Sequence, residues 1–437
     1  MPENKESQQE FNQRLLSFIQ SSPTPFHAVR TMQQQLLDAG FEPLAEEHVW
    51  KLRSGGKYFV TRNDSSLIAF TFSEDILQTG ISMVGAHTDS PCLKVKPNAD
   101  VVRHGYHQLG LEVYGGVLLN PWFDRDLSIA GRVSYAHAEK GLRHALLDFE
   151  QAIGIIPSLA IHLDRGVNEQ RSIDKQTDLP VVLALAGSVE ECTPFKSLLA
   201  ARLKSDGIVD SEVRVLDYEM CLYDTQPPAV IGMNQDFIAA ARLDNLLSCF
   251  VGLEALLAAS EDDDGSRLLV CTDHEEVGSA SAAGASGPML RDCLVRMCGS
   301  EENLIRTMQQ SMMISADNAH GVHPNYASKH DSNHGPVLNQ GTVIKINSNQ
   351  RYATNSETAA RFRLYAEKAG VSVQSFVVRS DMGCGSTIGP IAASELGVPT
   401  VDVGVPTFAM HSIRELAGSD DAWQLSRILG CFYRDNA

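Results

Sequence analysis

The amino-acid sequence predicts an α/β protein, a layered sheet with helices on its faces, interrupted by a β-rich inserted domain. Short apolar segments of strand type alternate with segments of helical period, which is typical of a sheet covered by helices. The stretch 98–232 breaks this alternation, because its first part is rich in valine, tyrosine and glycine. At roughly 150 residues per domain, a chain of 437 residues predicts two or three domains.

The first part of the chain predicts a helix, a hairpin and a strand. In residues 8–20 the apolar side chains recur at helical spacing, and the prolines that follow end the helix. Two apolar segments within 58–70 flank the turn Asn63–Ser66, which predicts a β-hairpin. Ile81–Val84 predicts a short strand that runs directly into a polar segment.

The middle of the chain predicts the inserted domain. Residues 98–140 carry turn signals between valine- and tyrosine-rich segments, which favours an antiparallel β block. Residues 165–178 are polar and loop-like, residues 186–204 have a helical pattern, and Gln226-Pro227-Pro228 closes the region. We therefore expect an inserted domain over 98–232 and a discontinuous catalytic domain over 1–97 and 233–437.

Strand and helix patterns alternate again after the insertion. Arg242–Ala259 carries leucines at helical spacing. Strands are expected at Arg267–Thr272, Met312–Ser315, Val343–Ile346, Val373–Val378 and Thr400–Val403.

Composition excludes several classes of function. Lysine and arginine number 36 against 54 aspartates and glutamates, a net charge of −18 that repels phosphate backbones, so no nucleic-acid partner is expected. No apolar run approaches the roughly 20 residues that span a bilayer, so no membrane partner is expected. The nine cysteines form no CxxC pair, and the N-terminus lacks an apolar signal segment, so we expect thiols in a reducing compartment and a cytoplasmic location.

Five short segments place a carboxylate or an imidazole where an element begins or ends. They are Val84–Asp89, Arg242–Asn245, Thr272–Gly278, Ser315–His320 and Ala409–Ser412. Because ligands of open α/β sheets collect outside the carboxyl ends of the strands, we expect these groups to converge. Histidine with aspartate and glutamate suits Zn²⁺, and two such ions can together activate a water and polarise a carbonyl.

Each of these residues also has an ordinary structural interpretation. His87 alone is typical of a structural histidine, Asp244 of an acid at a helix N-terminus, and Glu275-Glu276 of a solvated pair. A cluster such as His-Thr-Asp directly after an apolar strand favours the functional interpretation.

Other catalytic motifs are missing. His274-Glu275 is not a zinc HExxH helix, because position 278 is glycine. Gly383–Gly389 misses the GxGxxG spacing by one residue, and the polar run Asn347–Tyr352 is a loop of unknown role on pattern alone.

Two further residues keep two interpretations from pattern alone. Lys345, between isoleucines on a short strand, is either an edge charge that limits aggregation or a cation that faces a pocket. His162, beside the apolar run Leu159–Ile161, is either a buried core histidine or a functional group of the inserted domain.

Nine strings together resemble the M18 metalloaminopeptidases, the aspartyl-aminopeptidase group. In chain order they are GAHTDSPCLKVKP, NPWFDRDLSIAGR, LAIHLDR, ARLDN, DHEEVGS, SADNAHGVHPNY, KINSNQRYATN, CGSTIGP and FAMHSIRE. The match runs from about Phe26 to His411 and beyond.

The resemblance implies a ligand set by position. A co-catalytic pair of zinc ions per subunit, for which Mn²⁺ or Co²⁺ can substitute, would be held by His87, Asp244, Glu276, Asp317 and His411. In this assignment Asp244 bridges the ions, Glu275 is the general base, and Asp89 holds His87 in its tautomer.

For two residues the resemblance implies a role toward substrate. Lys345 would meet an acidic side chain of the first substrate residue. His162 would be either a zinc ligand or a substrate-binding residue that reaches the active site of a neighbouring subunit. We prefer the second role, because five other ligands already complete two sites.

The resemblance further implies a phosphorylase/hydrolase-like catalytic fold, an insertion used for dimerisation, and a tetrahedral dodecamer built from dimers. The expected function is removal of the N-terminal residue from short peptides with a free N-terminus, with preference for Asp or Glu. The alternatives are an aminopeptidase of broader or neutral preference, a metal-dependent deacylase or carboxypeptidase, and a non-enzymatic assembly protein of the same fold.

Overall fold

The chain packs as two compact units in this computed structural model, which describes residues 7–186, 192–261 and 265–435. The first unit consists of Met1–Ser90, Pro228–Met410 and Glu415–Ala437, and the second of Pro91–Pro227 and His411–Arg414. The sequence predicted an insertion over 98–232. The second unit starts earlier, because its first strand already begins at Cys92.

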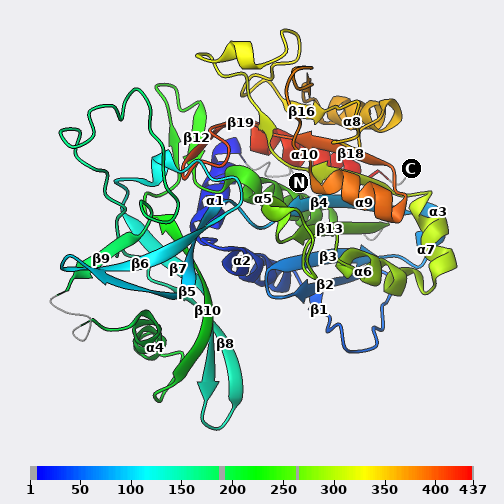
Figure 1. The fold of residues 1–437 in the computed structure, drawn as a ribbon. Helices are drawn as coiled ribbons and strands as arrows, with labels where there is room; N and C mark the ends of the chain where they lie inside the picture. The colour runs from blue at the N-terminus through cyan, green and yellow to red at the C-terminus, as the bar shows by residue number, and fades with distance from the viewer. Residues whose placement is uncertain (1–6, 187–191, 262–264, 436–437) are drawn as a thin grey trace. The chain divides into compact units, whose positions relative to one another are not determined.

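A nine-stranded sheet forms the centre of the first unit (Figure 1). Its order is β1-β2-β3-β13-β4-β14-β18-β16-β17. Strands β13, β4, β14 and β18 are mutually parallel, so their carboxyl ends lie at one edge of the sheet. The bounds are Glu42–Pro43 (β1), Gly56–Arg62 (β2), Ser66–Phe72 (β3), Ile81–His87 (β4), Ser266–Thr272 (β13), Met312–Ala316 (β14), Thr342–Lys345 (β16), Val373–Phe376 (β17) and Thr400–Gly404 (β18).

Helices cover both faces of this sheet. Consecutive strand residues such as Met83 and Val84 belong to two different apolar clusters, because successive side chains of a strand point to opposite faces. One cluster includes Gln8–Gln20 (α1), Pro25–Asp38 (α2), Leu243–Ala259 (α5), Ser356–Ala369 (α8) and Asp421–Tyr433 (α10). The other includes Ile76–Thr79 (α3), Met289–Cys298 (α6), Glu301–Met308 (α7) and Ile388–Leu396 (α9). The predicted α/β sheet with helices on both faces is confirmed.

Local signals in the sequence explain where several elements begin. The predicted helix over 8–20 is α1, and its N-terminus is closed by a capping box between Ser7 and Glu10. The predicted hairpin is the antiparallel pair β2–β3. The five strands predicted after the insertion are β13, β14, β16, β17 and β18.

A smaller five-stranded sheet completes the first unit. Its order is β11-β12-β20-β19-β15. The bounds are Ala229–Ile231 (β11), Phe237–Ala240 (β12), Ala319–His320 (β15), Pro406–Phe408 (β19) and Glu415–Gly418 (β20).

In its described residues, the second unit has an antiparallel sheet of six strands in the order β8-β7-β10-β5-β6-β9, packed on one helix. The predicted loop over 165–178 contains no helix or strand. The predicted helix over 186–204 begins only at Phe195, and residues 187–191 lie outside the described ranges. The bounds are Cys92–Arg103 (β5), Tyr106–Tyr114 (β6), Leu127–His137 (β7), Gly141–Asp148 (β8), Val181–Leu185 (β9), Phe195–Ser205 (α4) and Arg214–Asp224 (β10).

Short 3₁₀ turns connect these elements at Asn120–Trp122 (η1), Glu275–Val277 (η2) and Ala327–Lys329 (η3). Among the described helices, none combines the length and apolar character needed to cross a bilayer.

Candidate active site

The residues that the sequence singled out lie at or just after the ends of three neighbouring parallel strands. His87 is the last residue of β4 and pairs with Thr272, the last residue of β13. Glu275 and Glu276 follow β13, and Asp317 follows β14 on the other side of β4. Because parallel strands end at one edge of the sheet, side chains distant in sequence meet there.

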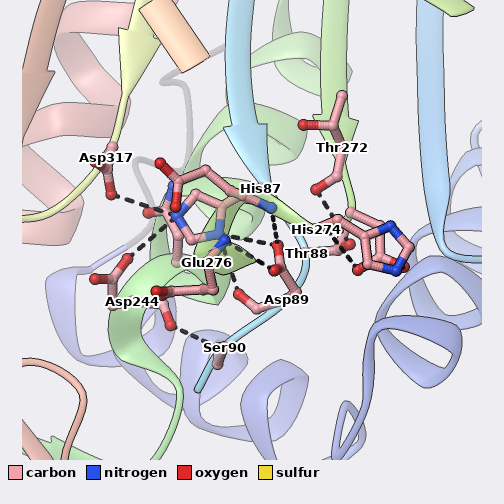
Figure 2. A network of polar contacts seen from close by, with 12 residues as sticks. His87, Thr88, Asp89, Ser90, Asp244, Thr272, His274, Glu276 and Asp317 are labelled. Carbon is pink, nitrogen blue, oxygen red and sulfur yellow. Dashed lines mark hydrogen bonds and ion pairs between the residues drawn. The ribbon is translucent and has the colours of Figure 1, made fainter. Parts of the chain in front are cut away.

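His87 is the centre of this cluster (Figure 2). Its Nε2 atom lies 3.4 Å from Oδ1 of Asp244 and 3.5 Å from Oδ1 of Asp317. The ligand atoms of His87, Asp244 and Asp317 lie within 4.8 Å of one another, as do those of His87, Glu275 and Glu276. The structure thus brings five of the predicted site residues together.

The main chain of Asp89 orients the imidazole. Nδ1 of His87 lies 3.0 Å from the main-chain oxygen of Asp89 and 3.4 Å from its carboxylate. A carbonyl only accepts, so Nδ1 carries the proton and Nε2 faces Asp244 and Asp317. This tautomer role was expected of Asp89, and the shorter of its two contacts with His87 comes from its backbone.

The carboxylate of Asp89 holds the two glutamates instead. Its Oδ1 accepts the amide of Glu275 and its Oδ2 accepts the amide of Glu276, each at 3.1 Å. The glutamates lie on η2, between His274 and Gly278, which both have positive φ. Gly278 is in a backbone conformation that favours glycine, with φ of 97°. Asp89 therefore fixes the turn that presents Glu275 and Glu276 beside His87.

Asp244 is positioned by residues that the sequence analysis did not single out. Its amide donates to Oε2 of Glu415 at 2.9 Å, and its main-chain oxygen accepts the hydroxyl of Ser90 at 2.6 Å. The neighbouring Asn245 donates through Nδ2 to the main-chain oxygen of Ala316 at 2.9 Å, which ties the start of α5 to the end of β14. Glu415 and Asn245 do occur within the strings FAMHSIRE and ARLDN, which is the signal that could have found them.

Lys345 lies against Asp317. Its Nζ is 3.0 Å from Oδ2 of Asp317 and 3.3 Å from the main-chain oxygen of Asn318, and it lies 5.1 Å from the centroid of the Tyr352 ring. β16 lies between β18 and β17, and Lys345 is 2% exposed. The alternative of a charge on an exposed strand edge is therefore wrong.

The charges of this cluster strongly influence one another. Burial raises the pKa of Glu275 to about 7, with His87 lowering it and the carboxylates of Asp317 and Asp244 raising it further. Burial and the Asp244 carboxylate hold the pKa of Glu276 well above its usual range. For Asp317 burial opposes ionisation, but the Lys345 ammonium and His87 together outweigh burial and keep the pKa of Asp317 far below its usual range.

His87 is subject to the same competition. Burial disfavours its charged form, yet the carboxylates of Asp244, Asp317 and Asp89 outweigh burial and raise the pKa of His87 well above 6.5. The carboxylates around His87 outnumber the Lys345 ammonium, and such an excess of buried negative charge is stable when cations neutralise it. One imidazole nitrogen with several carboxylate oxygens is the donor set of borderline divalent cations, so these residues fit zinc.

Comparison with known proteins assigns the chain to a family. The family described as "Aminopeptidase I zinc metalloprotease (M18)" matches residues 18–433. The chain belongs to the M18 family of zinc aminopeptidases. Proteins named "Probable M18 family aminopeptidase 2" from Azotobacter vinelandii and Pseudomonas syringae pv. syringae are each 58% identical to this M18 chain over 425 residues, covering 97% of it and 98% of the relative.

Solved structures of related proteins share the fold. A chain of the Ape4 and Nbr1 complex is 35% identical, with a TM-score of 0.93 over 98% of this M18 chain and 86% of that chain. A chain of the S. cerevisiae mApe1 dodecamer is 28% identical, with a TM-score of 0.83 over 97% of this chain and 96% of that chain.

Two predicted site residues of this M18 chain belong to the second unit. His411 follows β19 in the chain, and its Nδ1 lies 3.1 Å from the main-chain oxygen of Gly116, which puts the proton on Nδ1. His162 is exposed on the segment between β8 and β9. The alternative of a buried core histidine at position 162 is therefore wrong.

Proposed function

We propose that this M18 aminopeptidase removes the N-terminal residue of short peptides with two zinc ions and Glu275 as general base. The observation that carries the proposal is the pair Glu275-Glu276, held by Asp89 next to His87 and between carboxylates. Because the two glutamates are adjacent in one fixed turn, one can bind a cation while the other accepts and donates a proton beside it.

Five residues are proposed as the ligands, and Mn²⁺ or Co²⁺ is proposed to substitute for zinc. Asp244 would serve both ions, which is supported by its position beside His87 and within reach of Asp317. Bound zinc would supply Lewis-acid chemistry, which lowers the pKa of a water and polarises a carbonyl. The ligands are His87, Asp244, Glu276, Asp317 and His411.

Glu275 is proposed to take a proton from the attacking water and to pass it to the leaving amine. A base is most effective when its pKa lies near the working pH, and the pKa of Glu275, raised by burial to about 7, meets this condition. Asp89 positions the base through the backbone amide of Glu275.

Lys345 is proposed to favour substrates that begin with Asp or Glu. Its ammonium is buried at the Asp317 side of the cluster, above the ring of Tyr352. A positive charge in such a place attracts a substrate carboxylate, whereas a neutral side chain gains nothing from it. An aminopeptidase with broader or neutral preference is the alternative.

The second unit is proposed to join subunits into a homo-oligomer, with a tetrahedral dodecamer built from dimers as the expected assembly. One related structure is the mApe1 dodecamer. The apolar side chains of Leu159, Ile161 and Leu163, which lie close to His162 in the sequence, are 61%, 50% and 75% exposed. Exposed apolar groups of this kind favour contact with another chain, and we propose that His162 reaches a partner's active site.

Mixed oligomers test this role of His162. We expect inactive His162→Ala and inactive Glu275→Gln subunits to regain activity when they are assembled together, because each then supplies what the other lacks. Mixing is verified by mass analysis of differently tagged subunits. Mixed oligomers without activity would place the role of His162 within its own subunit.

A substrate panel tests the proposed function as a whole. Peptides that differ in the first residue, each with a free and an acetylated N-terminus, are assayed before chelation, after it, and after addition of zinc, manganese or cobalt. We expect cleavage of free peptides only, lost on chelation and restored by metal. Cleavage of the acetylated peptides would favour a deacylase or carboxypeptidase, and absence of any turnover would favour an assembly protein.

A further inference from the structure

Asp402 is a fully buried carboxylate outside the proposed ligand set. It lies on β18, is 0% exposed, and accepts two short hydrogen bonds from different loops. The hydroxyl of Thr387 donates to its Oδ1 at 2.5 Å, and the amide of Ala353 donates to its Oδ2 at 2.6 Å. Its own amide donates to the hydroxyl of Thr354 at 2.9 Å. One side chain therefore joins a central strand to two loops.

Both loops contain sequence segments that match no catalytic motif. The first, 347–355, contains the run Asn347–Tyr352, and the second, 382–387, contains the glycine-rich segment before α9. They also contact each other, because the hydroxyl of Ser386 donates to the main-chain oxygen of Arg351 at 3.2 Å and Nε of Arg351 donates to that of Cys384 at 3.3 Å.

The first loop reaches the candidate active site through Tyr352. The ring of Tyr352 lies 5.1 Å from Nζ of Lys345, which is paired with Asp317. A change in the position of this loop therefore changes the surroundings of Lys345.

The backbone near Asp402 is adapted to this carboxylate. A Cβ atom added to Gly389, in the first turn of α9, would lie 2.4 Å from Oδ1 of Asp402 and 2.5 Å from Oδ2. A side chain at position 389 would therefore displace the carboxylate or the helix. The glycine allows α9, whose N-cap is Thr387, to approach β18 closely enough for the hydrogen bond.

We infer that Asp402 is a positioning residue for substrate binding: it clamps loops 347–355 and 382–387 so that they form the wall that receives the side chain of the first substrate residue. This inference rests on the proposed aminopeptidase function. It concerns which chain segments bind that residue, and it holds whether the preferred residue is acidic or neutral.

Thr387→Val and Asp402→Asn test the clamp by hydrogen exchange of the holoenzyme. Thr387→Val removes the hydroxyl that donates to the buried carboxylate, and Asp402→Asn replaces one accepting oxygen by a donating NH₂ group. We therefore expect the amides of 347–355 and 382–387 to exchange about tenfold faster. Thr387→Val leaves the carboxylate in place, which keeps the test usable where Asp402→Asn does not fold. Thr387→Ser retains the hydroxyl and is expected to restore slow exchange.

Kinetics of the same variants test the substrate wall. With the best first residue found in the substrate panel, we expect KM to rise about tenfold in Thr387→Val while kcat changes less than twofold and metal content stays that of the wild type. Thr400→Val is the matched control, because it removes a hydroxyl at the start of the same strand, where Thr400 donates to the main-chain oxygen of Val398.

The outcomes separate this inference from the proposed function. Unchanged exchange in both loops would overturn the clamp, even if the enzyme proves to be an aminopeptidase. Faster exchange with unchanged KM would overturn the role of the loops as a substrate wall. Faster exchange in an enzyme without any peptidase activity would retain the clamp but refute the proposed function and, with it, the wall.

Discussion

Buried carboxylates occur in two different surroundings in the first unit. Asp402 and Asp421 each accept hydrogen bonds from groups of the fold, such as the amide of Ala353 for Asp402 and the amide of Asn339 for Asp421. Asp244 and Asp317 instead lie on either side of one imidazole nitrogen of His87.

The difference shows what each set of carboxylates requires. A buried carboxylate that accepts amides and hydroxyls has exchanged water for fixed donors, which offset part of the free-energy cost of its burial. Carboxylates that face one another repel, and their burial is stable with cations or bound protons between them. Burial alone therefore does not identify the functional residues, whereas the groups that face each carboxylate do.

Substitution of Glu275, the proposed general base, is expected to have the largest effect on turnover. We expect Glu275→Gln to lower turnover roughly 10²- to 10⁴-fold while both metals stay bound, because the amide cannot accept the proton. Turnover and metal content are measured on the same samples, with the exposed Glu302→Gln as control. Near-normal turnover with full metal content would contradict the assignment.

Substitution of Asp244, the proposed bridging ligand, offers the next test. We expect Asp244→Asn to weaken binding of both metals, whereas His87→Ala or His411→Ala mainly weakens one, because a bridging carboxylate serves two ions. Elemental analysis after equilibration at defined free zinc measures the stoichiometry. If Asp244→Asn bound two metals with wild-type affinity, the proposed bridging role of Asp244 would be refuted.

Substitution of Lys345 distinguishes a role in substrate binding from a role in holding Asp317, a proposed metal ligand. If its ammonium binds the substrate carboxylate, Lys345→Leu should lower kcat/KM for Asp relative to Leu substrates by about 2–5 kcal/mol in transition-state free energy. If it serves Asp317 alone, metal affinity should fall and the ratio should stay unchanged. Lys51→Leu on an exposed segment is the control, and an unchanged ratio would refute the selector role.

Substitution of Asp421 is expected to have the smallest effect, and the property that it changes is the stability of the fold. Burial raises its pKa to about 7, although the amide of Asn339 opposes this shift. Its folded-state pKa exceeds the roughly 3.9 of an unfolded aspartate, so its contribution to stability is fully present below pH 4 and is lost as the pH rises through 7.

The side chain of Asp421→Asn stays neutral at every pH. We therefore expect its free energy of unfolding to increase relative to that of the wild type as the pH rises from 5 to 8, by a few kcal/mol at most. Melting curves of the apoprotein at both pH values measure the difference, with the exposed Asp210→Asn as control. An equal difference at both pH values would show that Asp421 does not change its protonation in this range.

Local sequence signals predicted most of the elements. The period of α1, its capping residues and the prolines after it all lie within about 20 neighbouring positions, so the helix could be delimited without knowledge of the fold. The start of α4 at Phe195 and of β5 at Cys92 differed from prediction, because the ends of elements depend on packing as well as on period.

The sequence by itself determined the strand and helix pattern, the residue types at the ends of β4, β13 and β14, and the family. Only the tertiary structure decided that Lys345 lies on Asp317, that the carboxylate of Asp89 holds the backbone of Glu275, and that Asp402 joins two loops. The reason is physical: periodicity and turn chemistry act between neighbours in the chain, whereas these contacts depend on the order of strands in the sheet, which packing of the whole unit selects.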